Sequence, residues 1–444
     1  MQEWHKSQSG GTRIGGGYGR GSRGDGPLGG RDRARGGRRV IKTAIDVRWA
    51  DEIDFLKALI RIPSDNPPGD TVTHAEETAN RLEALGFQVE RHPVPEPFVK
   101  QHGMRSVTNL IVREKFGEGT GPTIALNAHG DAVPPGEGWT SDPYGAEEIA
   151  GAIYGRGAAV SKSDFATYAF ALLALKEAPG KLNGTVELHL TYDEEAGGFV
   201  GPRWLLEQGL TRPDYAISAG FSHAVTTAHN GCLHLEIVIR GRQAHAATPE
   251  LGIDALEVAT PVLAALYEER KRLLGIRSEI PGIGTPQLTV GLIEGGINTN
   301  VVPDRVTLRV DRRLIPEEDG NVAEEALIDL VESAAPERDG LEVECRRIML
   351  ADPMRPVPGT ERLADTLKRH AREVLSEDVR DTGVPLYTDA RHYTQAGIPT
   401  VLYGAGPQSI ADANAHGADE HVMLSDLRAA TEVIALAVRD ILTQ

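Results

Sequence analysis

Residues 123–131 read TIALNAHGD, in which a short apolar run at 123–129 ends in a histidine and is followed by a glycine and an aspartate. Apolar runs of this length are typical of strands that are buried on both faces of a parallel sheet. Similar runs occupy residues 186–192, 215–218 and 400–403. The helical pattern at 165–178 fits the crossover connection that parallel strands require. The sequence therefore predicts an α/β fold with a mainly parallel sheet.

Between residues 232 and 347 the pattern changes to the order β-α-β-β-α-β. The expected strands are 233–239, 287–293, 305–312 and 341–347, and the expected helices are 254–274 and 322–334. This order is that of a split-βαβ, or ferredoxin-like, domain. We therefore expect a small domain at 232–347 that is inserted between two parts of a larger domain, 44–231 and 348–444.

The first 39 residues differ from the rest of the chain. They contain 13 of the 50 glycines and nine of the 47 Lys and Arg residues, with almost no aliphatic side chains. Such a segment buries too little apolar surface to offset the entropy that ordering costs. We interpret residues 1–43 as a disordered Gly/Arg-rich extension, and an RNA-binding arm remains a less favoured alternative.

The composition excludes several classes of partner and compartment. The net charge of −17 leaves no basic surface for nucleic acid on the folded part. Two cysteines, Cys232 and Cys345, are too few for a disulfide framework and indicate a reducing compartment. The sequence has neither an apolar run long enough to span a membrane nor a hydrophobic signal-peptide core. We therefore expect a cytoplasmic protein with a small-molecule substrate.

Acidic and imidazole side chains follow three of the expected parallel strands. His129 and Asp131 follow the first, Glu194 and Glu195 follow the second, and a loop with His416 follows the strand at 400–403. Ligands bind at the carboxyl ends of the strands in open α/β sheets. Each group alone has an ordinary structural explanation. Their convergence provides the imidazole and carboxylate ligands and the free base of a metal-assisted hydrolase.

Six motifs, which together span about residues 45–444, resemble those of the zinc-dependent aminoacylase–carboxypeptidase G family, which includes acetylornithine deacetylase and succinyl-diaminopimelate desuccinylase. They are LNAHGDAVPPGEGWTSDPYG, YGRGAAVSK, TYDEEAGG, GRQAHAATPELGIDAL, GGINTNVVPDRVTLRVDRRLIP and AHGADEHV. This resemblance implies that His129, Glu195 and His416 bind a divalent metal ion, with zinc expected and cobalt or manganese as alternatives. It also implies that Asp131 orients His129 and that Glu194 is the general base.

The resemblance assigns further roles around the substrate. His245 in the inserted domain would reach the active site of a partner subunit and stabilise the oxyanion there. Asn300 and Arg313 would bind a substrate carboxylate, and Gly404 and Gly406 would let the backbone approach the substrate. The inserted domain would pair with its copy to form a homodimer.

Two positions depart from the family pattern. The acid that usually follows the Gly-Arg-Gly segment is replaced by Val160, and the acid at the end of the fourth strand is replaced by Gly220. Neither side chain can bind a metal ion. We therefore expect a single ion instead of a pair, held by the three ligands that remain.

Three other outcomes remain open. Asp164, His223 or His229 could replace the missing ligands. Ser161 or Ser163, which flank a lysine, could act as a nucleophile in a metal-independent amidase. The chain could also bind a small ligand without catalysis. The leading interpretation is metal-assisted hydrolysis of an amide bond in a small N-acyl amino acid or dipeptide-like substrate.

Overall fold

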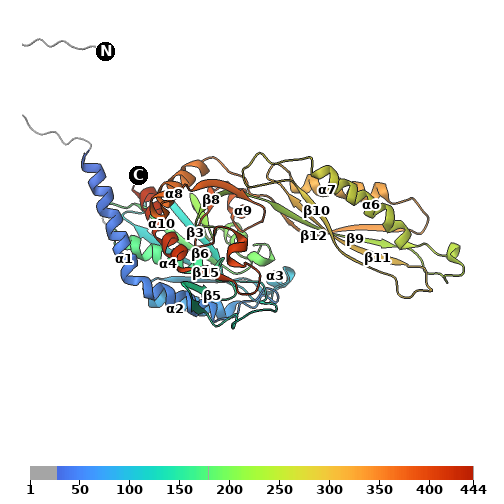
Figure 1. Ribbon diagram of the computed structural model, residues 1–444, viewed down its shortest axis with the longest axis horizontal. Helices are drawn as coiled ribbons and strands as arrows, with labels where there is room; N and C mark the ends of the chain where they lie inside the picture. Colours follow the sequence, from blue (N-terminus) through green and yellow to red (C-terminus); the bar gives the residue numbers. More distant parts are fainter. Residues whose placement is uncertain (1–27, 179, 444) are drawn as a thin grey trace, which may run out of the picture.

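An eight-stranded sheet forms the centre of the larger domain in the computed structural model, which describes residues 28–178 and 180–443 (Figure 1). In spatial order its strands are β1 (Val89–Pro93), β2 (Thr108–Phe116), β6 (Gly184–Thr191), β3 (Thr123–His129), β7 (Tyr215–Ser218), β14 (Thr400–Leu402), β8 (Ala224–His229) and β13 (Arg380–Val384). The pairs β6–β3, β3–β7, β7–β14 and β8–β13 run parallel, and the other pairs run antiparallel. The predicted mainly parallel sheet is confirmed.

Helices cover both faces of this sheet, which explains why its central strands β3 and β6 are buried almost throughout. On one face α4 (Lys162–Lys176) packs against α1 (Leu28–Ile60) and α10 (Leu424–Leu442). On the other face α5 (Pro202–Glu207) and α9 (Ala390–Gln395) pack beside the alternate strand residues Ala125 and Ala216. The remaining helices of this domain are α2 (Val72–Ala84), α3 (Glu96–Gln101) and α8 (Thr360–Leu375).

The start of α1 contradicts the prediction of a disordered extension over residues 1–43. The helix begins at Leu28, and Ile41 and Ile45 are buried in the core of the larger domain. Arg38 pairs with Glu373 at 2.9 Å and with Glu432 at 3.3 Å. The prediction failed because the glycine- and arginine-rich residues 28–39 carry no apolar spacing of their own, and core residues further along the helix, such as Ile41 and Ile45, anchor it. The part of that prediction that concerns residues 1–27 lies outside the described residues.

A three-stranded sheet that the sequence did not predict joins two loops at the edge of the larger domain. It contains β15 (His421–Met423), β5 (Ala152–Tyr154) and β4 (Glu147–Ile149), in that order. The buried carboxylate of Glu420 forms an ion pair with Arg156 and accepts a hydrogen bond of 3.1 Å from the Ala159 N–H. These contacts hold the loop that carries His416 beside the Gly-Arg-Gly segment.

The inserted domain projects from the larger domain and has its own core (Figure 1). Its elements are β9 (Gly231–Arg240), α6 (Ala255–Leu273), β10 (Gln287–Gly295), β11 (Arg305–Leu314), α7 (Gly320–Ala334) and β12 (Glu342–Ala351). The antiparallel sheet has the order β10-β11-β9-β12, as in a ferredoxin-like domain. Asp254 and Asp319 cap α6 and α7 by accepting backbone hydrogen bonds. The predicted fold of the insertion is confirmed.

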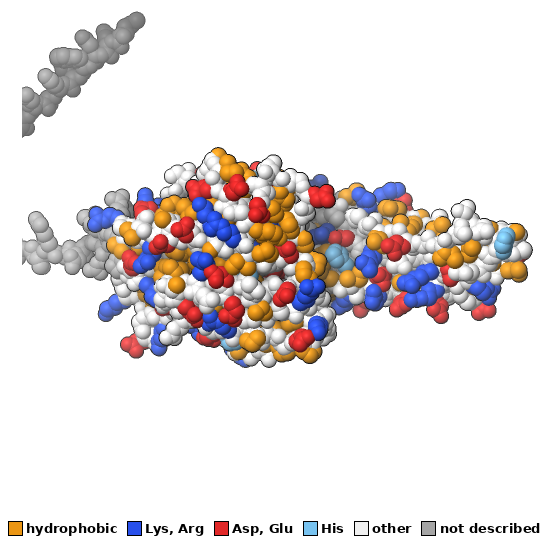
Figure 2. Space-filling view, turned by 90° about the horizontal axis from the view of Figure 1, so that it is seen from below, with side chains coloured by type: hydrophobic (Ala, Val, Ile, Leu, Met, Phe, Trp, Pro, Cys, Tyr) orange, Lys and Arg blue, Asp and Glu red, His pale blue; other side chains and the backbone are white. Residues whose placement is uncertain are grey.

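The two faces of this sheet differ in character. Leu233, Leu235 and Ile237 of β9 belong to the apolar core that α6 and α7 cover. The alternate residues carry polar side chains on the opposite face, where Glu236 pairs with Arg309 and Arg346. Figure 2 shows basic and acidic side chains interspersed along this domain. Among the described residues, no helix is both long and apolar enough to cross a bilayer.

Candidate active site

The carboxyl ends of β3, β6 and β14 meet at a cavity of about 380 Å³. Its walls come from both domains. The side chains that line it include His129, Glu194, Glu195, Arg313, Asp389, His416 and Glu420. The three strand ends that the sequence predicted to converge therefore do share one cavity, as expected for an open α/β sheet.

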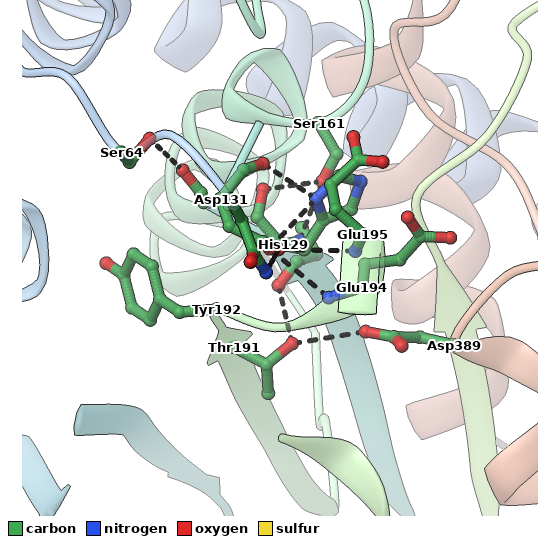
Figure 3. Close-up of polar contacts among 12 residues, drawn as sticks. Ser64, His129, Asp131, Ser161, Thr191, Tyr192, Glu194, Glu195 and Asp389 are labelled. Carbon is green, nitrogen blue, oxygen red and sulfur yellow. Dashed lines mark hydrogen bonds and ion pairs between the residues drawn. The ribbon is translucent and has the colours of Figure 1, made fainter. Parts of the chain in front are cut away.

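Asp131 ties the loop after β3 to the loop after β6 (Figure 3). Its carboxylate accepts hydrogen bonds from Asn66 Nδ2 at 2.9 Å and from the backbone N–H groups of Glu194 at 3.3 Å and Glu195 at 3.2 Å. His129 Nδ1 lies 3.0 Å from the Asp131 carbonyl oxygen and 3.4 Å from Asp131 Oδ1. An Nδ1–H that is held in this way leaves Nε2 available as a ligand.

His129, Glu194 and Glu195 each offer a ligand atom, and these atoms lie within 4.8 Å of one another. Burial raises the pKa of Glu194 to about 8, and the charges of Glu195 and Asp131 add to this shift against the opposing effect of His129. Burial opposes the charge on His129, but the Asp131 hydrogen bond and the charge of Glu194 raise the pKa of the imidazole well above its usual value. These acidic groups crowd together beside an imidazole, so the donor set fits a divalent cation.

His416 reaches this cluster through Glu195. Its Nε2 lies 3.3 Å from Glu195 Oε1, and its backbone adopts a φ of +63° that bends the loop toward the cavity. Glu195 therefore belongs to the cluster with His129 and also contacts His416. Among the described residues, the group whose ligand atoms all lie within 4.8 Å of one another contains Glu194 and does not contain His416.

The two departures from the family pattern have different structural settings. Val160 lines the cavity, so an acid there would face the cluster. Gly220 also lines the cavity, but a Cβ atom there would lie 2.7 Å from Leu402 Cβ and 3.0 Å from the backbone of Tyr403. The close approach of β14 therefore leaves no room for a side chain at position 220 without displacement.

Two of the three proposed substitute ligands already have other partners. His223 contacts Glu377 at 3.0 Å and Asp426 at 3.4 Å. His229 donates from Nδ1 to the Asn230 carbonyl at 2.8 Å and accepts at Nε2 from the Thr388 N–H at 3.3 Å. Neither histidine lines the cavity, so we do not propose either one as a substitute ligand.

Asp164 is fully buried. It accepts a hydrogen bond of 2.7 Å from the Ala405 N–H, and burial raises its pKa to about 8. Gly404 packs directly on this carboxyl group, where a Cβ atom would lie 2.0 Å from Asp164 Oδ1. A Cβ atom at Gly406 would lie 2.6 Å from the Gly220 carbonyl oxygen. Packing inside the domain accounts for both glycines, and neither lines the cavity.

Ser161 and Ser163, the candidate nucleophiles of a metal-independent amidase, form hydrogen bonds with backbone groups. Ser161 Oγ accepts from the His129 N–H at 2.7 Å and donates to the His129 carbonyl at 3.1 Å. Ser163 donates to the Ala159 carbonyl at 2.9 Å, and Lys162 donates to the Ile62 carbonyl at 3.2 Å. None of the three lines the cavity, so neither Ser161 nor Ser163 is placed to attack a substrate there.

The inserted domain contributes to the cavity unequally. Arg313 lines it, whereas Asn300 and His245 do not. His245 and Asn300 are neighbours elsewhere on the domain, where His245 bridges to Val301 and the Ala246 N–H donates to the Asn300 carbonyl at 3.0 Å. Both lie away from the cavity of their own chain.

The sequence did not reveal Asp389, which lines the cavity, or the buried Arg391, whose charge acts on it. Asp389 lines the cavity and accepts from Thr191 Oγ1 at 3.3 Å, and burial together with the charge of Glu194 raises its pKa to about 8. The buried Arg391 guanidinium donates to the Thr388 carbonyl at 2.8 Å and stacks on the ring of Tyr387. Both follow β13, whose sequence RDTGV lacks the apolar pattern of the other strands.

The fold and the donor set define a two-domain α/β protein with a candidate metal-binding cavity. The chain belongs to the peptidase family M20/M25/M40, whose family model matches residues 125–440. It is 30% identical over 411 residues to an acetylornithine deacetylase of Proteus mirabilis, covering 89% of this chain and 98% of that protein. It is 27% identical over 382 residues to a succinyl-diaminopimelate desuccinylase of Nitratiruptor, covering 83% and 95%. Members of this family are hydrolases that act on C–N bonds.

Solved structures share the fold. Human carnosine dipeptidase 1 superposes with a TM-score of 0.70 at 18% identity, covering 92% of this chain and 99% of that one. A di-peptidase from Saccharomyces cerevisiae superposes with a TM-score of 0.73 at 14% identity, with the same coverage. A peptidase of Bacillus subtilis, described as dinuclear and metal-binding, has a TM-score of 0.62 at 18% identity, covering 88% and 98%. The predicted family resemblance is confirmed.

Proposed function

We propose that this chain hydrolyses the amide bond of a small N-acyl amino acid or dipeptide-like substrate with the help of a divalent ion. The observation that carries this proposal is the cluster of His129, Glu194 and Glu195 in a cavity that Arg313 also lines. Its volume of about 380 Å³ suits a small molecule. The names of the relatives, a deacetylase and a desuccinylase, support the same substrate class.

His129, Glu195 and His416 would hold the ion, with Asp131 fixing the orientation of His129. When bound, a zinc-like ion polarises the substrate carbonyl and makes water more acidic. Imidazole and carboxylate ligands suit zinc, cobalt and manganese. Because Val160 and Gly220 offer no ligand atoms, we propose one ion for this chain instead of two.

Glu194 is the proposed general base. It lines the cavity, and burial raises its pKa to about 8. A bound cation would favour the ionised form of this carboxyl group, which can accept a proton from water and return it to the leaving amine. Gln in its place would keep the shape but could not carry the proton.

Arg313 is the proposed anchor for the substrate carboxylate. Its guanidinium pairs with Asp311 through Nε at 2.9 Å and Nη2 at 3.1 Å. This pair sets the orientation of the guanidinium at the cavity wall, where its remaining N–H groups are available.

His245 and Asn300 would act in the active site of a partner subunit, because they lie away from their own cavity. The inserted domain also has exposed apolar side chains on its edge strand and outer helix, among them Ile293 of β10 and Tyr267 of α6. We propose a homodimer that forms through this domain. Two free cysteines, Cys232 and Cys345, support a cytoplasmic location.

The test is a panel of N-acyl amino acids and dipeptides, assayed with chelated protein before and after zinc is restored. We expect turnover of at least one panel member only with the ion. Activity that is fully retained after exhaustive chelation would overturn the metal-assisted mechanism. If the chain bound zinc and substrate without turnover, it would instead be a non-catalytic ligand-binding protein. The absence of acids at Val160 and Gly220 is the observation that favours this alternative.

A further inference from the structure

A second group of metal-ligand side chains lies in the inserted domain, apart from the cluster around His129. It consists of Cys232 and His234 on β9 and Asp311 on the neighbouring strand β11. The sulfur, imidazole nitrogen and carboxylate oxygen that they offer lie within 4.8 Å of one another. We call this group the Cys232 cluster.

The strand register creates the Cys232 cluster. In the antiparallel pair of β9 and β11, Asp311 lies opposite His234, and Arg313 lies opposite Cys232. Side chains alternate along a strand, so Cys232 and His234 point away from the core that Leu233 belongs to. The cluster therefore lies on the face of the sheet that α6 and α7 do not cover.

The distances suit a tetrahedral cation. Cys232 Sγ lies 3.9 Å and His234 Nε2 lies 3.1 Å from Asp311 Oδ2. Zinc with bonds of about 2.3 Å to sulfur and about 2.0–2.2 Å to nitrogen and oxygen holds its ligand atoms about 3.3–3.7 Å apart. Small side-chain movements would bring the three atoms to these separations without a change in the backbone.

The Cys232 cluster is buried on the side of the cysteine and open to solvent on the side of His234 and Asp311. The Cys232 side chain is buried, whereas the side chains of His234 and Asp311 are 37% and 30% exposed. An ion could therefore reach the cluster from solvent and complete its coordination with water.

We propose that Cys232, His234 and Asp311 form a binding site for a thiophilic divalent cation of the zinc class, separate from the catalytic cluster. A thiolate ligand favours zinc-like ions over magnesium or calcium. The catalytic cluster has no sulfur ligand, so the two sites differ in chemistry.

Asp311 connects this cation site to the cavity. One of its oxygens accepts from Arg313 Nε at 2.9 Å, and the other accepts from Arg313 Nη2 at 3.1 Å and faces His234. Arg313 lines the cavity. A bound cation would fix the carboxylate that orients this guanidinium, as partners of metal ligands commonly do.

The test is titration of the chelated full-length chain with cobalt(II), followed by near-ultraviolet absorption. Cobalt that is bound to a thiolate gives a charge-transfer band, whereas cobalt held by imidazole and carboxylate alone does not. We expect the band in the unaltered chain, its loss in Cys232→Ser, and its retention in the matched control Cys345→Ser. His129→Ala, which alters only the catalytic cluster, should keep it.

A second variant provides an independent test, because a change at the buried Cys232 can also impair folding. His234→Ala alters a partly exposed side chain and should weaken cobalt binding at this site at least about tenfold. Absence of the band in the unaltered chain, its persistence in Cys232→Ser, or unchanged affinity in His234→Ala would overturn the proposal. Loss of the band in His129→Ala would contradict two separate sites.

Discussion

Glu194 is the residue on which the proposed chemistry depends most. We predict that Glu194→Gln lowers kcat at least about a hundredfold, because the amide cannot accept the proton of the attacking water. Steady-state kinetics on the best substrate of the panel would measure this. Glu207→Gln, an exposed change on α5, is the matched control and should leave kcat unaltered. Equal turnover in Glu194→Gln and the unaltered chain would refute its role as base.

Glu52 makes the stability depend on pH. It is fully buried on α1, its Oε1 lies 2.5 Å from Thr431 Oγ1, and burial raises its pKa from 4.5 to about 8. The folded state therefore keeps a proton that the unfolded chain releases. This contribution to stability is complete below about pH 4.5 and falls by about 1.4 kcal/mol per pH unit until about pH 8.

We predict that Glu52→Gln, which cannot ionise, removes this loss. Urea unfolding at about pH 5 and about pH 8 should show that the variant gains free energy of unfolding relative to the unaltered chain as the pH rises. If the two chains lost stability in parallel over this range, burial of a protonated Glu52 would be wrong.

At the scale of the elements, the ends of β7 and β14 fix what position 220 can hold. A Cβ atom at Gly220 would meet Leu402 Cβ at 2.7 Å. We predict that Gly220→Ala lowers the free energy of unfolding by about 1–3 kcal/mol, the usual cost of overpacking. Thermal unfolding would measure the change. Gly284→Ala is the control, because no atom lies within 4 Å of its added Cβ, and an equal effect of both variants would contradict the packing argument.

Strands buried on both faces were predictable from the sequence, and short polar strands were not. The expected ranges 123–129 and 215–218 coincide with β3 and β7, because each is an apolar run with turn residues beside it. β13, with the sequence RDTGV, has no such pattern, and the strands β4, β5 and β15 are each only three residues long. Their pairing depends on tertiary contacts that a local pattern cannot reveal.

The residues of the candidate site likewise fall into those that the sequence predicted and those that it did not. His129, Glu194 and Glu195 were found because they directly follow recognisable strands. Asp389 was missed because it follows β13. The contact of His229 Nε2 with the Thr388 N–H joins segments that are 159 residues apart in the sequence. Spacing along the chain therefore reveals which residues reach the cavity edge, but not which of them are already engaged.

At the scale of the whole molecule, the distance of His245 from its own cavity predicts an active site that two subunits share. Glu194→Gln and His245→Ala should each be nearly inactive as separate dimers. Mixed dimers would contain one site with both an intact Glu194 and an intact His245. Equal mixing should therefore restore about a quarter of the unaltered activity. No recovery in dimers shown to exchange subunits would place His245 outside the partner's site.

The apolar edge of the inserted domain should maintain that dimer. Ile293 on β10 is 52% exposed, and we predict that Ile293→Glu weakens dimerisation at least about tenfold, because the interface would bury an unpaired charge. Sedimentation over a concentration series would measure this. Ile149→Glu, which changes an apolar side chain of similar exposure in the larger domain, is the control. A monomeric and fully active unaltered chain would contradict the dimer.

The most direct test of the proposed catalytic site is anomalous X-ray scattering at the zinc edge from crystals of zinc-loaded, active protein. We predict a peak within bonding distance of His129 and Glu195, beside the carboxyl group of Glu194. Active protein whose crystals show no such peak between the ends of β3 and β6 would contradict the proposed metal-assisted hydrolysis.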